Sequence, residues 1–153
     1  MQLVNIENGF SLIENDKVVF SHTTDNPAIF IGKGKEKMDI YRGNFDIEDY
    51  VIERYPLKNA KVDGNKVLLS AYNDVARIWI RIPAQKEEFV WGCGEQMSYF
   101  NLRGRHFPLW TSEPGVGRDK TTEITFLSDK YNKAGGDYYN TNYPQPTFVS
   151  SRK

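Results

Sequence analysis

Short runs of apolar and β-branched residues recur along the chain, and turn-forming residues separate them. This pattern is typical of β-strands joined by tight turns. The clearest alternation of apolar and polar positions covers residues 77–82. It predicts that the isoleucines of this run face the core (Ile78, Ile80, Ile82) and that the residues between them face the other side (Arg77, Trp79, Arg81). We expect strands at residues 10–13, 18–21, 28–31, 38–41, 67–71, 77–82, 89–91, 123–127 and 147–150.

Turn-forming triplets lie between several of these runs, at residues 14–16, 25–27, 63–65 and 135–137. No stretch has a convincing helical period, and residues 46–57 have room for at most a helical turn or two. The pattern therefore predicts an all-β fold for residues 1–153, an antiparallel β-sandwich rather than a closed barrel, formed as one domain.

The composition supports a packed core and limits the partners. Hydrophobic residues make up 39% of the 153 positions and aromatic residues 14%, which favours a globular domain over disorder. Twenty basic residues balance twenty acidic ones, whereas binding to nucleic acid or to an anionic membrane requires a basic excess. We therefore expect no nucleic-acid and no membrane partner, and no apolar run is long enough to span a bilayer.

The cysteine and histidine content limits disulfides and metals. Cys93 is the single cysteine, so the chain forms no internal disulfide, and the two histidines, His22 and His106, lie too far apart for ordinary zinc-ligand spacing. We expect neither a metal nor a cofactor. The single cysteine favours a cytoplasmic location, and the first ten residues lack the basic start of a secretory signal.

Residues 91–96, with the sequence WGCGEQ, place two glycines before a carboxylate and an amide. Such glycines allow tight backbone turns and the close approach of another strand. Glu95 could orient a loop or a ligand hydroxyl, but the favoured interpretation is a strand that ends in a bulge, with Glu95 bonded to nearby backbone amides.

Residues 102–118 form the most informative segment, LRGRHFPLWTSEPGVGR. The segment is too long for an ordinary hairpin, and long loops in compact domains are often functional. Trp110 offers a flat face for a sugar ring, and Glu113 and Arg118 could bond hydroxyl or anionic groups. The competing interpretation is a surface loop whose apolar residues pack into the sandwich.

Three catalytic or nucleotide-binding motifs find no support in the sequence. The pieces GKGK and GVGR lack the spacing of a phosphate-binding loop, which needs four residues between its first glycine and a Gly-Lys-Ser/Thr. Glu95 and Glu113 have no feature that establishes the carboxylate separation of a glycosidase. Cys93 and His106 lack a third orienting group, so Cys93 fits better as a small buried apolar residue. We therefore assign no catalytic residue to this chain.

Residues 91–104 and 107–118 nevertheless resemble a conserved part of glycoside hydrolase family 31, in its amino-terminal domain. The pieces AGGDYY at residues 134–139 and YPQPTFVS at residues 143–150 are similar to the bacterial α-glucosidase and sulfoquinovosidase branch of that family. Upstream matches to the same branch are DNP at residues 25–27, IG at residues 31–32 and RGNF at residues 42–45.

The resemblance implies a galactose-mutarotase-like β-sandwich that precedes a catalytic (β/α)8 barrel. In this family two aspartates of the barrel hydrolyse α-glycosides with retention, and no position here matches them. The chain alone is therefore expected to be inactive, with carbohydrate bound through the barrel. A loop of the amino-terminal domain reaches the leaving-group side of the active site, and Thr111, Ser112 and Glu113 fall at that loop. With Trp110 and Arg118 they form the expected substrate-binding set.

The chain departs from this family in one stretch and at its end. Residues 58–77 are shorter than in the relatives by about one hairpin, and the sequence leaves open whether this is natural. The last residues follow a strand directly, which indicates a piece of a longer protein.

Two other functions remain open at this point: a free-standing carbohydrate-binding module and a small-ligand β-barrel. The oligomeric state cannot be read from the sequence.

Overall fold

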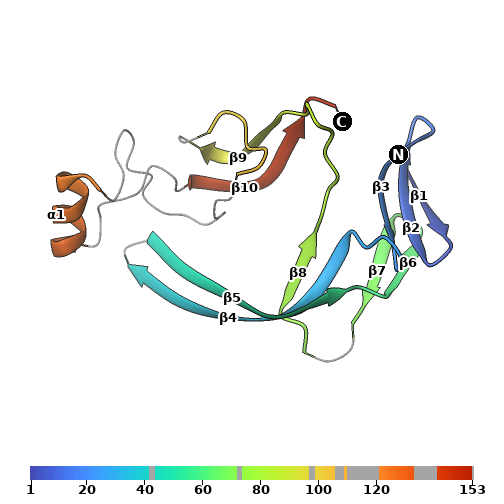
Figure 1. Ribbon diagram of the computed structural model, residues 1–153, viewed down its shortest axis with the longest axis horizontal. Helices are drawn as coiled ribbons and strands as arrows, with labels where there is room; N and C mark the ends of the chain where they lie inside the picture. The colour runs from blue at the N-terminus through green and yellow to red at the C-terminus, as the bar shows by residue number, and fades with distance from the viewer. Residues whose placement is uncertain are drawn as a thin grey trace. The chain divides into compact units, whose positions relative to one another are not determined.

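A computed structural model of the chain describes residues 1–41, 44–71, 74–96, 99–105, 109, 121–132 and 141–152. This part contains ten strands and one short helix, and the registered strand pairs are antiparallel (Figure 1). The all-β prediction is therefore confirmed. The chain divides into two compact units, one of residues 1–36 and 49–84 and the other of residues 37–48 and 85–153.

The first unit begins with a three-stranded sheet in the order β1-β2-β3. Its strands are β1 (Gln2–Ile6), β2 (Gly9–Glu14) and β3 (Lys17–Thr23). The turn between β2 and β3 contains Asn15 and Asp16, whose φ angles are 48° and 60°. Asparagine and aspartate tolerate this left-handed region better than other side chains do. The expected turn at residues 14–16 is thereby confirmed.

A second sheet has the order β5-β4-β8, and a separate hairpin joins β6 to β7. The bounds are β4 (Ile29–Tyr41), β5 (Asn44–Pro56), β6 (Asn59–Asp63), β7 (Lys66–Ser70) and β8 (Arg77–Ile80). The helical turns allowed for residues 46–57 are wrong. Residues 46–56 belong to β5, and Leu57 directly follows that strand. Pairing along the long β4 strand overrides the weak local preference of that segment.

The core of the first unit lies between these sheets. Four fully buried apolar residues form its centre, namely Phe10, Ile29, Ile31 and Leu57. Partly buried residues from five strands and one connection surround them: Leu3, Phe20, Tyr55, Ala60, Val62, Val67 and Val75. Full burial of an Ile, Leu or Phe side chain contributes about 1.5–3 kcal/mol. Side chains from both sheets thus close one apolar layer, as the predicted sandwich requires.

His22 links the two sheets of this unit through its ring. The residue is 1% exposed, and its Nε2 donates to the Leu57 carbonyl at 3.1 Å. Its Nδ1 accepts from the backbone amides of Ala28 and Ile29 at 3.2 and 3.1 Å. These two donors require an unprotonated Nδ1 and therefore a neutral ring. Burial lowers the pKa of His22 from its ordinary value of 6.5, and the bond to Leu57 opposes that shift.

The predicted faces of the residues in β8 are confirmed, but the predicted burial of the isoleucines is wrong. Ile78, Ile80 and Ile82 are 57%, 61% and 47% exposed, whereas Arg77 and Trp79 are partly buried. Ile78 and Ile80 lie opposite Ile31 and Ile29 on the apolar face, as the alternation requires, but at the sheet edge. On the other face Trp79 lies under the Arg54 guanidinium, 5.1 Å from the ring centroid. A cation over an aromatic ring stabilises this second face, and the alternation alone could not reveal it.

The second unit contains the paired strands β9 (Val90–Gln96) and β10 (Thr141–Ser150) and the helix α1 (Glu123–Asn132). The strand predicted at residues 123–127 is wrong, because these residues begin α1. The Thr125 amide donates to the Thr122 hydroxyl at 3.3 Å, and Glu123 lies in the first helical turn. A capping hydroxyl and an early carboxylate favour a helix over a strand here. No helix of the described residues is long and apolar enough to cross a membrane.

We predict that His22 makes the fold sensitive to mild acid. In the unfolded chain His22 becomes protonated as the pH falls through its ordinary pKa. In the folded chain its protonation requires a lower pH. The free energy of unfolding should therefore decrease as the pH falls from about 7 to about 5. Replacement of His22 by Ala should cost at least about 2 kcal/mol, because buried backbone groups lose their partners.

Urea unfolding of the wild-type chain across this pH range measures the effect. A His106→Asn variant retains His22 and should keep the pH dependence, whereas His22→Asn should flatten it. Equal pH dependence in both variants would contradict the role of His22.

Candidate functional site

The predicted substrate-binding residues, Trp110, Thr111, Ser112, Glu113 and Arg118, lie outside the residues that the structure describes. The structure does describe the base from which their segment starts. We define this loop base as residues 85–96, 99–105 and 148–152. Its backbone geometry and polar contacts show how the residues before this segment are held.

The backbone at residues 92–94 has three consecutive positive φ angles. They are 113° at Gly92, 64° at Cys93 and 92° at Gly94. A Cβ atom on Gly94 would lie 1.9 Å from the Tyr143 carbonyl oxygen, so β10 approaches β9 too closely for any side chain there. The β9–β10 register shifts twice between Thr141 and Phe148. The bulged strand expected at residues 91–96 is therefore present, and its glycines are required by the approach of β10.

A buried carboxylate fixes the end of β10 to the start of β9. Glu88 is 4% exposed, and its Oε2 accepts from the Gln85 amide at 2.7 Å. The Ser150 hydroxyl donates to the other carboxylate oxygen, Oε1. Beside it, the Phe89 amide donates to Ser151 Oγ at 3.0 Å, and the Ser151 amide donates to the Phe89 carbonyl at 3.0 Å. Hydrogen bonds to a charged group are stronger than neutral ones, so Glu88 is a firm anchor.

Residues 101–103 attach the start of the candidate loop to the same place. The Asn101 side-chain oxygen accepts from the amides of Val90 and Arg103 at 3.1 and 3.2 Å. The amide of the buried Leu102 donates to the Val90 carbonyl at 2.8 Å. The Arg103 guanidinium donates to the carbonyls of Lys86 and Glu88. The candidate loop therefore leaves from a position that side-chain and backbone bonds define.

An aromatic cluster lies on the loop base. The rings of Phe89 and Trp91 stack with centroids 6.0 Å apart, and Phe100 meets Trp91 at a tilted angle with centroids 6.1 Å apart. Phe100 is 86% exposed. The Trp91 Nε1 is buried without a hydrogen-bond partner among the described residues. The sequence predicted a strand at residues 89–91, whose spacing places Phe89 and Trp91 on one face, but it gave no signal that these rings meet Phe100.

Cys93 and Glu95 have no arrangement that supports catalysis by themselves. Burial raises the pKa of the Cys93 thiol above its ordinary value of 9.0, which keeps the thiol protonated at neutral pH. Glu95 is exposed at the end of β9, and Glu113 lies outside the described residues. No group of three or more metal-binding side chains occurs within the described ranges.

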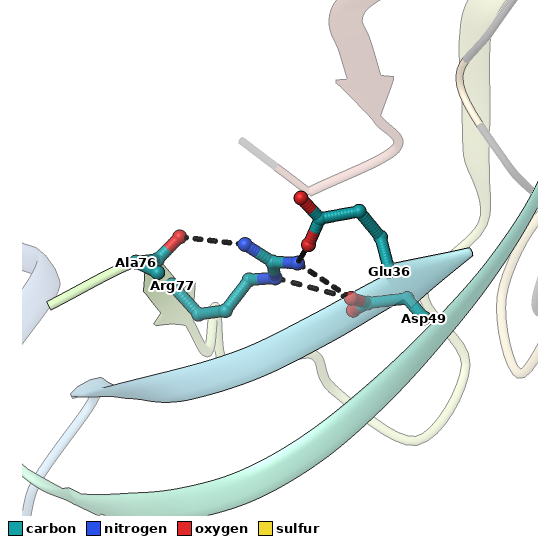
Figure 2. A network of polar contacts seen from close by, with 4 residues as sticks. All are labelled: Glu36, Asp49, Ala76 and Arg77. Atoms are coloured by element: carbon teal, nitrogen blue, oxygen red, sulfur yellow. Dashed lines mark hydrogen bonds and ion pairs between the residues drawn. The ribbon is translucent and has the colours of Figure 1, made fainter. Parts of the chain in front are cut away.

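An ion-pair network lies on the surface of the first unit (Figure 2). Asp49 accepts from Arg77 Nε and Nη2 at 3.1 and 2.8 Å, Glu36 accepts from Nη2, and the Ala76 carbonyl accepts from Nη1 at 2.9 Å. The bonds to Asp49 and Glu36 raise the pKa of Arg77. Because these side chains are solvent-accessible, we interpret the network as a link that holds the start of β8 against β4 and β5, and not as a ligand site.

Comparison with known proteins gives relatives that match all or nearly all of the chain but extend far beyond it. A sulfoquinovosidase from Agrobacterium fabrum is 54% identical, covering 100% of this chain and 26% of that protein. A sulfoquinovosidase from Escherichia coli is 42% identical, covering 94% of this chain and 26% of that protein. No family model matches the chain. The chain thus spans about a quarter of the length of these relatives.

Among solved structures, a glycoside hydrolase family 31 sulfoquinovosidase from E. rectale, in complex with an aza-sugar inhibitor, matches with a TM-score of 0.79. It is 50% identical, and the match covers 100% of this chain and 26% of that one. The alignment with the A. fabrum protein runs over 175 positions against 153 residues here, an excess of 22 positions. An excess of this size agrees with a chain that is shorter than its relatives by about one hairpin.

We predict that Gly94 is essential to the loop base and that Gly104 is not. Gly94→Ala should destabilise the chain by at least about 3 kcal/mol, because its Cβ would meet a backbone oxygen and force β9 and β10 apart. Gly104→Ala is the matched control, since Gly104 also has a positive φ, 69°, but nothing lies within 4 Å of its Cβ position. It should cost only about 1–2 kcal/mol.

Urea unfolding of both variants gives the two losses. Similar losses for Gly94→Ala and Gly104→Ala would show that the close approach of β10 does not constrain this position.

Proposed function

Because the chain belongs to glycoside hydrolase family 31 and corresponds to the amino-terminal part of its sulfoquinovosidases, we propose that it is the non-catalytic amino-terminal domain of a retaining α-glycosidase. The observation that carries this proposal is the identity of 54% over the entire chain. The complete enzyme would hydrolyse α-sulfoquinovosides, since both curated relatives are sulfoquinovosidases. An α-glucoside is the alternative substrate, and it has less support.

In this proposal the candidate loop, residues 102–118, contributes to the leaving-group side of the active site. Trp110, Thr111, Ser112, Glu113 and Arg118 would contact the leaving group, and the barrel would supply the catalytic carboxylates. The support is the family resemblance of the segment, together with its anchored start. A loop that leaves from a fixed base loses less conformational entropy when it meets a ligand or a second domain.

A free-standing carbohydrate-binding module has less support. The aromatic cluster of Phe89, Trp91 and Phe100 is exposed in part, as such a module would require. The Trp91 ring, however, already contacts two neighbouring aromatic rings. The proteins that match the whole chain are hydrolases. A closed small-ligand barrel is not favoured either, because the described strands form four separate sheets of two or three strands.

The remaining attributes follow from the proposal and from composition. The partner of the complete enzyme is a carbohydrate, and the balanced charge gives no reason to add a nucleic acid. The cytoplasmic location stays a prediction, based on the single cysteine.

We predict that Glu113 of the complete enzyme recognises a sugar leaving group. Glu113→Ala should lower kcat/KM for a substrate with a sugar leaving group about two- to tenfold more than for an aryl α-sulfoquinovoside. A hydrogen bond to a leaving-group hydroxyl can be lost only where that hydroxyl exists, and such a bond contributes about 0.5–1.5 kcal/mol.

The measurement is the ratio of kcat/KM for the two substrates in wild type and variants. Glu113→Gln keeps an acceptor and should change the ratio less, and Glu87→Ala, at an exposed turn of this chain, should leave it unchanged. An unchanged ratio in Glu113→Ala would mean that Glu113 is only a structural loop residue.

A further inference from the structure

Strand β8 ends the β5-β4-β8 sheet and pairs with β4 alone among the described strands. Its register with β4 places Ile78 opposite Ile31 and Ile80 opposite Ile29. The Arg81 amide donates to the Ala28 carbonyl at 2.8 Å, so extended pairing continues one residue beyond the strand. We define the isoleucine strip as Ile78, Ile80 and Ile82.

The isoleucine strip continues the apolar face of the first unit without being covered. Ile29 and Ile31 are each 4% exposed, whereas their direct neighbours Ile80 and Ile78 are 61% and 57% exposed. Three β-branched apolar side chains in a row at an open sheet edge are uncommon, because such an edge pairs readily with another strand. Natural edge strands usually carry charges, a proline or a bulge at these positions. The three isoleucines supply none of these features; the charged Arg77 and Arg81 alternate with them on the other face, and Pro83 follows the strip.

The backbone of β8 presents its free hydrogen-bonding groups at the same three residues. In an antiparallel ladder successive residues direct their N–H and C=O groups to alternate sides. Arg81 uses its amide toward β4, so alternation directs that of Trp79 the same way. The N–H and C=O groups of the isoleucine strip then point to the open edge. Apolar side chains and unpaired backbone groups therefore coincide on one short strand.

We propose that β8 pairs with β8 of a second copy of this chain, antiparallel and centred on Ile80. In this register Ile80 meets Ile80 of the partner subunit, and Ile78 meets Ile82 of the partner subunit. Each of these pairs is a hydrogen-bonded pair, because all six residues direct their backbone groups outward. A register centred on Trp79 would instead place Ile82 opposite Ala76. The register about Ile80 thus matches every isoleucine of the strip with another isoleucine.

The opposite face of the sheet favours the same register. It places Trp79 opposite Arg81 of the partner subunit, twice by symmetry, and a guanidinium over an indole is attractive. Arg81 lies 5.8 Å from the centroid of the Phe30 ring and has no carboxylate within ion-pair distance among the described residues, whereas Arg77 is bound to Glu36 and Asp49 (Figure 2). Both faces are thus self-complementary about one two-fold axis, as an isologous interface requires. This pairing does not depend on the proposed hydrolase function.

The first test is sedimentation equilibrium of the 153-residue chain over a wide concentration range. We expect a monomer–dimer equilibrium that Ile80→Lys weakens by at least about tenfold, because it places two like charges directly opposite each other. Ile124→Lys is the matched control, since Ile124 is 64% exposed on α1. It should leave the equilibrium unchanged, and circular dichroism confirms that both variants fold. A chain that stays monomeric, or a dimer that survives Ile80→Lys, would overturn the proposal.

The second test fixes the register by disulfide trapping in a Cys93→Ala background. Ile80→Cys should form a covalent dimer readily, because opposite residues of a hydrogen-bonded pair have Cα atoms about 5.5 Å apart. Ile78→Cys should not, since Ile78 of the partner subunit lies opposite Ile82, four residues along the strand. Equal trapping in both variants would refute the register. If the wild-type chain is monomeric and Ile80→Lys instead weakens its association with the remaining part of a relative's enzyme, the strip docks that part and the self-pairing is wrong.

Discussion

The three hydrogen bonds of His22 are the constraint on which the first unit depends. One ring on β3 bonds the backbone where β4 begins and the carbonyl just after β5 ends. These bonds set the distance between two sheets whose apolar side chains then fill the space between them. Apolar burial supplies most of the stability but is not directional. The hydrogen bonds of the His22 ring are directional and fix how the two sheets meet. They require a buried ring that stays neutral.

The sequence predicted the strand-rich class and several turns because period-two alternation and turn residues are local signals. It did not predict α1, because a run with alternating apolar residues is compatible with a strand until the capping Thr122 is considered. It also did not predict that the strip at Ile78 and Ile80 is exposed. Alternation tells which residues share a face, and only the sheet order shows that this face ends at an edge.

The length and composition of residues 102–118 pointed to a functional loop, the resemblance added Thr111 and Ser112 and a place for the loop, and the described residues explain only its base. The glycines at 92 and 94 gave a local signal for a bulge, and the structure adds the reason, a carbonyl of β10 at the Cβ position of Gly94. The anchors Glu88 and Asn101 had no sequence signal, because their partners depend on tertiary contacts. Together they anchor the base of a loop whose proposed binding site would be completed by another domain, which agrees with a chain that spans about a quarter of its relatives' length.

The most direct measurement is the activity of a hybrid enzyme. In it, this chain replaces the matching segment of the A. fabrum sulfoquinovosidase, with which it shares 54% identity. If the chain is a scaffold domain of this family, the folded hybrid should hydrolyse an aryl α-sulfoquinovoside with kcat/KM of the same order as the parent enzyme. A hybrid that folds as stably as the parent and shows no turnover would contradict the account.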